Sequence, residues 1–239
     1  MEENRVAAEG ISAVAESALL MNLVQLNLRS NYFGPDEGNA LAKSTNLAKL
    51  EALNLGNNDL GAEAGGAVLR SQMPLLKTLS IDGNELTDDG ALALADARQL
   101  RKLEFLQVNW NQFIARGIKA IAAAKHMSHL RELDLSANPI GAVEAIALAK
   151  SRILANLSEL VLSRCEIDDE GAVAIAGSQY LHHLQTLYLS YGTIGNTGAV
   201  ALAHSKTLNK LVTLCLTGNG FDNSARKALR ESYGKRVQI

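Results

Sequence analysis

The chain has 239 residues, of which 47% are hydrophobic and only 4% aromatic, and its formal net charge at pH 7 is −2. This composition predicts an aliphatic core large enough for one stable domain. The small net charge and the lack of a basic tail or a polybasic, lipidated or long apolar stretch argue against nucleic acid and against a membrane as partners.

The first segment predicts an incomplete repeat. Asn4 and Gly10 have the same spacing as Asn84 and Gly90 in a later repeat. We therefore expect residues 1–22 to form a partial first repeat that has a helix and lacks its strand, which would leave the next strand with an open edge. Two explanations remain open, namely earlier repeats or a domain that lie outside this chain, and self-association at this edge.

The N-terminal segment also bears on location. The chain starts with two acidic residues after Met1, and Ser12 and Glu16 interrupt the apolar stretch that follows, unlike a secretory signal peptide. Cys165 and Cys215 are predicted to lie two stacking steps of about 4.8 Å apart, which is too far for a disulfide. We expect reduced thiols and a cytoplasmic protein, or an effector translocated into another cell.

A repeated leucine pattern runs through most of the chain. The pattern Leu-x-x-Leu-x-Leu/Ile/Val recurs with a period of 26 or 27 residues, and its first leucines are Leu23, Leu50, Leu76, Leu103, Leu130, Leu157, Leu184 and Leu211. This period predicts a leucine-rich-repeat solenoid. We expect a single domain, 1–239, with eight repeats over residues 23–224, the last running on into the tail, and a C-terminal cap over 225–239.

Within a repeat, a strand is followed by a helix. Leu133 and Leu135 alternate with polar residues, as in a strand with one buried face. The segments 90–95, 171–176 and 198–203 have apolar residues at helical spacing. Strands stack at about 4.8 Å and helices at about 8 to 10 Å, so the predicted fold is a curved α/β solenoid with parallel strands on its concave side and helices on its convex side.

Asparagines end most of the predicted strands. They form a column of side chains that we expect to hydrogen-bond backbone groups of neighbouring repeats: Asn31, Asn58, Asn84, Asn111, Asn138 and Asn219. Cys165 and Gly192 interrupt this column. Glycine has no side chain to offer, so we expect the seventh repeat to be the loosest.

Candidate metal and catalytic residues have simpler explanations. Acidic residues such as Asp88 and Asp168 precede the predicted helices, where a carboxylate offsets the helix dipole. His129 and His183 occupy equivalent positions two repeats apart, about 10 Å by strand stacking, which is too far for one zinc ion. The sequence has no phosphate-binding loop or nucleophile motif. We expect no enzyme activity, cofactor or metal.

The C-terminal segment is predicted to close the solenoid. Arg226, Lys227 and Arg230 make the last helix polar. Residues 236–239 are predicted to add a short strand over residues 211–216, as a terminal cap requires.

These repeats resemble the ribonuclease-inhibitor-type class of leucine-rich repeats, which has a full helix on the convex side. Gly90-Ala91-Leu92-Ala93 also resembles the Gly-Ala-Leu-Ala repeats of bacterial effectors, and residues 154–172 and 228–239 are similar to bacterial multi-repeat proteins. The resemblance implies recognition of a macromolecule, most simply a protein, by the curved face.

The predicted binding patch lies on that face and gathers several of the few aromatic residues. It consists of Phe105, Gln107, Trp110, Asp134, Arg164, Tyr188 and Tyr191. These include the Trp, Tyr and Arg types that dominate interface hot spots. The competing interpretation is that scattered aromatics merely cover the leucine ladder.

An alternative function is regulation of a GTPase, because similar solenoids include the GTPase-activating protein of Ran. Arg164 would then supply positive charge to a phosphoryl transition state. The simpler interpretation of Arg164 is a cation at the rim of the sheet, paired with Glu159 or Asp134.

Overall fold

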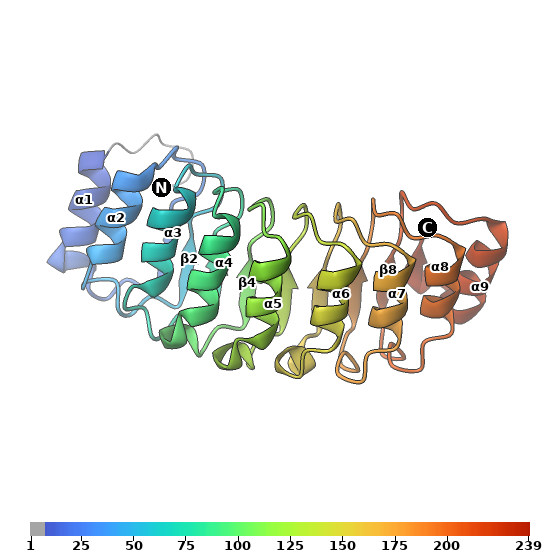
Figure 1. Cartoon of the computed structure of the whole chain (residues 1–239). Helices are drawn as coiled ribbons and strands as arrows, with labels where there is room; N and C mark the ends of the chain where they lie inside the picture. The colour runs from blue at the N-terminus through green and yellow to red at the C-terminus, as the bar shows by residue number, and fades with distance from the viewer. Residues whose placement is uncertain (1–7) are drawn as a thin grey trace.

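The computed structural model describes residues 8–239, and the segment that carries the predicted repeat start at Asn4 lies outside the described residues. Figure 1 shows one row of helices in front of one row of strands, from the N-terminal end to the C-terminal end. The predicted α/β leucine-rich-repeat solenoid is therefore confirmed.

The strands form one sheet in sequence order, and every pair of neighbours is parallel. The strands are β1 (Gln25–Asn27), β2 (Ala52–Asn54), β3 (Thr78–Ser80), β4 (Phe105–Gln107), β5 (Glu132–Asp134), β6 (Glu159–Val161), β7 (Thr186–Tyr188), β8 (Thr213–Cys215) and β9 (Val237–Gln238). Pairing is in register, so Leu106 lies beside Leu133 and Leu133 beside Leu160.

The α-helices alternate with the strands. They are α1 (Ala8–Glu16), α2 (Pro35–Lys43), α3 (Gly61–Arg70), α4 (Thr87–Asp96), α5 (Ala115–Ala123), α6 (Ala142–Ala149), α7 (Asp169–Ala176), α8 (Asn196–Ala203) and α9 (Asn223–Tyr233). Short 3₁₀ helices follow several of them: η1 (Ala18–Leu20), η2 (Arg98–Leu100), η3 (Lys125–Met127), η4 (Ile153–Asn156) and η5 (Gly234–Arg236).

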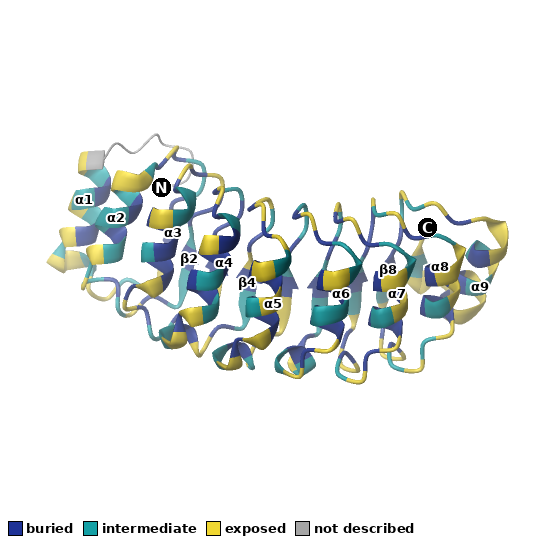
Figure 2. Cartoon of the chain, viewed as in Figure 1, coloured by how far each residue is buried: buried dark blue, intermediate teal, exposed yellow. Residues whose placement is uncertain are grey.

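The core lies between the sheet and the helices. The central leucine of each strand from β1 to β8 and the last aliphatic residue of each pattern are buried, as are the first leucines from Leu50 on and the inner faces of the helices, for example Ile121 and Leu148. Figure 2 shows the outer faces of the helices as exposed or half-buried. A continuous aliphatic core of this kind is the sum of contacts between neighbouring repeats, since no repeat buries its own apolar edge alone.

The predicted asparagine column is present. Asn58 Oδ1 accepts hydrogen bonds from the backbone N–H groups of Asn31 and Phe33, both at 3.0 Å, and its Nδ2 donates to the carbonyl of Leu28 at 3.1 Å. Cys165 replaces this amide with a weak thiol contact to the carbonyl of Leu135 at 3.6 Å. The greater looseness of the seventh repeat, at Gly192, stays a prediction.

The acidic residues near the helix starts act as caps, and some of them cap a neighbouring helix. Asp168 accepts from the N–H of Gly171 within its own helix α7 at 3.0 Å. Asp169, by contrast, accepts from the N–H groups of Gly195 and Gly198 at the start of α8, both at 2.7 Å. These carboxylates therefore join adjacent repeats as well as offset the helix dipole.

The two ends of the sheet differ. The predicted closing strand is confirmed, because β9 pairs with β8 and aligns Val237 with Leu214. Tyr233 adds a hydrogen bond from its hydroxyl to the carbonyl of Leu202 at 2.8 Å. At the other end, among the described strands, β1 pairs with β2 alone. The predicted open edge at the first strand stays a prediction, as do the domain bounds.

Candidate functional site

The turn after each strand places one residue in a left-handed backbone conformation. This residue is the eighth of the repeat, counted from the first leucine, and its φ lies between 52° and 75° in Ser30, Asn57, Gly83, Trp110, Ala137, Arg164, Tyr191 and Gly218. From Ser30 to Tyr191, its N–H donates to a carbonyl of the next repeat, as from Trp110 to Ser136 at 3.0 Å and from Tyr191 to Thr217 at 2.8 Å. The backbone ladder thus continues past the strand and fixes the turn.

Two large aromatic residues occupy this strained position. A left-handed backbone costs an L-residue about 1–2 kcal/mol, which is why glycine is favoured there, as at Gly83 and Gly218. Trp110 and Tyr191 nevertheless stand at equivalent places, with 59% and 57% of their surface exposed. Because these side chains are exposed, they add little to the packing that would offset this strain.

Arg164 lies against Tyr191. Its guanidinium carbon is 4.8 Å from the centre of the tyrosine ring, within range of a cation–π interaction. The predicted pairing of Arg164 with Glu159 or Asp134 is wrong, because none of the ion pairs among residues 8–239 involves Arg164. The guanidinium is instead held at the outer edge of the turn by an aromatic neighbour.

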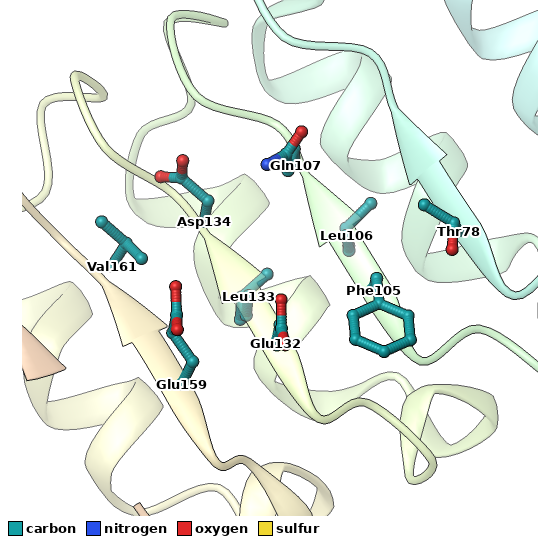
Figure 3. Close-up of a pocket in the computed structure, with 9 residues that line it drawn as sticks. All are labelled: Thr78, Phe105, Leu106, Gln107, Glu132, Leu133, Asp134, Glu159 and Val161. Carbon is teal, nitrogen blue, oxygen red and sulfur yellow. The ribbon is translucent and has the colours of Figure 1, made fainter. Parts of the chain in front are cut away.

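A pocket of about 330 Å³ opens on the strand face, meaning the solvent-facing side of the sheet and the turns after its strands. It lies across β4, β5 and β6 and is lined by Thr78, Phe105, Leu106, Gln107, Glu132, Leu133, Asp134, Glu159 and Val161 (Figure 3). Of the predicted patch, it brings together Phe105, Gln107 and Asp134. Trp110, Arg164, Tyr188 and Tyr191 lie outside it, although Tyr188 pairs in register with Val161 on its wall.

Three carboxylates make this pocket acidic. Glu132 and Glu159 lie directly opposite each other on β5 and β6, and Asp134 follows on β5. Figure 3 shows the side chain of Glu132 between those of Phe105 and Glu159. Within the described part of the chain, no cation is paired with any of the three. Like charges in direct register are unfavourable.

The environment shifts two of these carboxylates toward the neutral form. Burial raises the pKa of Asp134 above its ordinary value, against hydrogen bonding to Ser136, which lowers it. Burial likewise raises the pKa of Glu159, and the nearby charges of Glu132 and Asp134 raise it further. The Ser136 N–H holds Asp134 Oδ1 at 2.8 Å and so fixes that carboxylate in place.

The sequence prediction missed Glu132 and Glu159. Both occupy the third place of their repeats, where the prediction included only Phe105. The signal was present, because strand pairing aligns third-place residues, as the register of Phe105, Glu132 and Glu159 shows. A comparison of that column along the chain would have revealed an aromatic ring followed by two acids.

Neither a metal-binding cluster nor a membrane-spanning helix is present among the described residues. Among residues 8–239, no group of three His, Cys, Asp or Glu residues is arranged to hold a metal ion. His129 and His183 both line a second pocket of about 370 Å³ with Arg131, at the edge of the strand face. No helix within 8–239 has the length and apolar character needed to cross a bilayer.

Known proteins support the fold assignment. The model of the Leucine Rich repeat family matches residues 46–69, 72–95, 126–149, 154–176 and 180–203. No curated protein matches the sequence of this chain. Among solved structures, the Arabidopsis receptor kinase HAESA, in complex with the peptide hormone IDA and the co-receptor SERK1, is similar at 22% identity over 87% of this chain, with a TM-score of 0.56.

A second similar structure is the plant peptide hormone receptor RGFR1 in complex with RGF2, at 18% identity over 88% of this chain and a TM-score of 0.48. This chain spans only 33% of the HAESA chain and 31% of the RGFR1 chain. The identity to HAESA supports a shared fold alone. With its family matches, its parallel sheet and its asparagine column, the chain is a leucine-rich-repeat protein.

Proposed function

We propose that the strand face binds a protein partner. The observation that carries this proposal is the pair of exposed aromatic residues, Trp110 and Tyr191, on left-handed turns. Large aromatic side chains that are exposed at a strained backbone position contribute little to the core, and recognition of a partner is the use that fits their exposure.

The rest of the predicted patch extends this surface. Arg164 is held against Tyr191, and the pocket that contains Phe105 and Asp134 extends from the repeat of Trp110 to the repeat of Arg164. Three stacking steps of about 4.8 Å separate the repeats of Trp110 and Tyr191, so the patch extends over about 14 Å. An interface of ordinary size covers such a patch and a rim around it.

We assign Arg164 to this protein-binding surface rather than to GTPase regulation. Its guanidinium stacks over Tyr191 on the same turn column, and this contact favours a binding role. The helix in each of the described repeats further supports the proposed ribonuclease-inhibitor-type class. The free thiols of Cys165 and Cys215 support the proposed cytoplasmic setting.

The proposal is tested by an interaction screen with three forms of the chain: wild type, the double variant Trp110→Gly/Tyr191→Gly, and Val173→Ser. Val173 is 42% exposed on α7, on the helix side, and serves as a control surface. We expect partners that bind wild type and Val173→Ser and are lost from the double variant. Partners that bind all three forms equally would overturn the proposal.

A further inference from the structure

We propose that the partner inserts a basic side chain, an arginine or a lysine, into the acidic pocket formed by Phe105, Glu132, Asp134, Glu159 and Val161. This inference rests on the proposed protein-binding function and specifies the chemistry of the partner. Three observations support it: the pocket carboxylates have no paired cation among residues 8–239, other carboxylates of the strand face do, and the pocket wall has both apolar and acidic groups.

The first argument is that the pocket carboxylates have no counter-charge among residues 8–239. Glu132 and Glu159 face one another across β5 and β6, and Asp134 is added on the same wall. Burial raises the pKa of Glu159, and the nearby charges of Glu132 and Asp134 raise it further, so the three carboxylates repel one another on this face. A cation from the partner relieves this repulsion. The attraction between the cation and the carboxylates is stronger where the contact is buried.

The second argument is that carboxylates around the pocket are neutralised by the chain itself. Glu51 and Lys77 both directly follow the first leucine of their repeats, and they form an ion pair at 2.8 Å. Arg131 lies 3.5 Å from Glu104 in the same column. Asp82, two strands away from Asp134, is held by Arg29 at 2.8 Å. Among residues 8–239, these other carboxylates of the strand face thus have a cation from the chain itself, whereas Glu132, Asp134 and Glu159 have none.

The third argument is the mixed chemistry of the pocket wall. Val161 and the half-buried ring of Phe105 supply apolar surface next to the carboxylates, and Figure 3 shows this ring beside Glu132. Long basic side chains bury an aliphatic stem against apolar groups and keep the charged end near acceptors. An aromatic ring adds a cation–π contact. At about 330 Å³, the pocket is at the small end of ligand sites and suits one inserted side chain.

The test uses a phage-displayed library of random dodecapeptides, panned on the immobilised full chain. Selected peptides are synthesised and titrated into the protein, and Trp110, the only tryptophan of the chain, reports binding by fluorescence. We expect enrichment of arginine or lysine, and at least a tenfold loss of affinity when that residue is replaced by glutamine.

Matched protein variants locate the cation, with the titration of each read by the anisotropy of labelled peptide. Glu132→Gln/Glu159→Gln keeps the shape of the pocket and removes two charges, so we expect at least a tenfold weaker affinity. The control Glu51→Gln removes a carboxylate that pairs with Lys77 on the same face, and we expect less than a threefold change. Thermal melting of each variant checks that the fold is retained.

The possible outcomes separate this inference from the proposed function. Peptides that need Trp110 and Tyr191 but carry no basic residue, or that ignore Glu132→Gln/Glu159→Gln, would overturn the inference and leave the function standing. If no peptide depends on Trp110 or Tyr191, both fail. Concentration-dependent sedimentation abolished by Glu132→Gln/Glu159→Gln would identify a second copy as the occupant and would also overturn it.

Discussion

Arg29 and Asp82 form a two-pronged ion pair that reaches over the intervening repeat at Gly56. The guanidinium nitrogens of Arg29 lie 2.8 Å and 2.9 Å from the two carboxylate oxygens of Asp82, and the hydroxyl of Ser80 adds a hydrogen bond at 2.7 Å. A side chain at Gly56 would collide with both partners, so the glycine is needed for a close approach rather than for an unusual φ.

We predict that Gly56→Ala lowers the free energy of unfolding by about 1–3 kcal/mol, as expected for overpacking at a tight contact. The control is Gly220→Ala, where an added methyl group would meet nothing closer than the Ile194 carbonyl at 3.9 Å. Urea unfolding of both variants measures the difference. Equal stabilities for the two would show that the ion pair does not require Gly56.

We predict that Trp110→Gly is more stable than Trp110→Ala by about 1 kcal/mol, because the left-handed backbone strains alanine and not glycine. Gln107, on β4, provides a control with the opposite sign: there alanine should be the more stable replacement. Thermal melting of the four variants decides the matter. The same order at both positions would contradict the left-handed turn.

We predict that Cys165→Asn raises the free energy of unfolding by about 1 kcal/mol, since an amide restores the hydrogen bonds that Asn58 makes elsewhere in the column. Burial raises the pKa of the Cys165 thiol to about 12, so this thiol should also resist alkylation in the folded protein. Urea unfolding and mass spectrometry after iodoacetamide treatment measure the two effects. A destabilised Cys165→Asn would mean that the site is shaped for sulfur.

We predict a pH dependence from the raised pKa values of Asp134 and Glu159. Their ordinary values are 3.8 and 4.5, and the folded chain holds protons to a higher pH than the unfolded chain. Stability associated with these groups is therefore present below that window and is lost as pH rises through it. As pH rises from about 4 to about 7, the free energy of unfolding of wild type should fall relative to that of Glu132→Gln/Glu159→Gln. A constant difference across this range would contradict the prediction.

The sequence predicted the repeating scaffold because its physical causes are local. Alternation of leucines defines the strands, the asparagines end them, and the last residues form the closing strand at Val237. The period aligns equivalent residues of successive repeats, so the places of Trp110 and Tyr191 on one face also followed from the pattern.

The missed features depend on contacts between repeats. The ion pair of Arg29 with Asp82 skips one repeat, and the stacking of Arg164 on Tyr191 depends on the turn between strand and helix. A second polar column was missed for the same reason: Ser178 and its equivalents donate to a carbonyl at the end of the helix of the preceding repeat, as in the 2.5 Å bond to Ala149. Such partners are distant in sequence and carry no motif.

The central claim, that the strand face binds a protein, is tested most directly by the affinity of one purified partner from the interaction screen for wild type, Trp110→Gly, Tyr191→Gly and Val173→Ser. Each loss of an aromatic hot spot of about 2 kcal/mol corresponds to a roughly 30-fold higher Kd. We expect that increase for Trp110→Gly and Tyr191→Gly and an unchanged Kd for Val173→Ser. An unchanged Kd for both turn variants, with weakened binding by Val173→Ser, would place the interface on the helix side and contradict the claim.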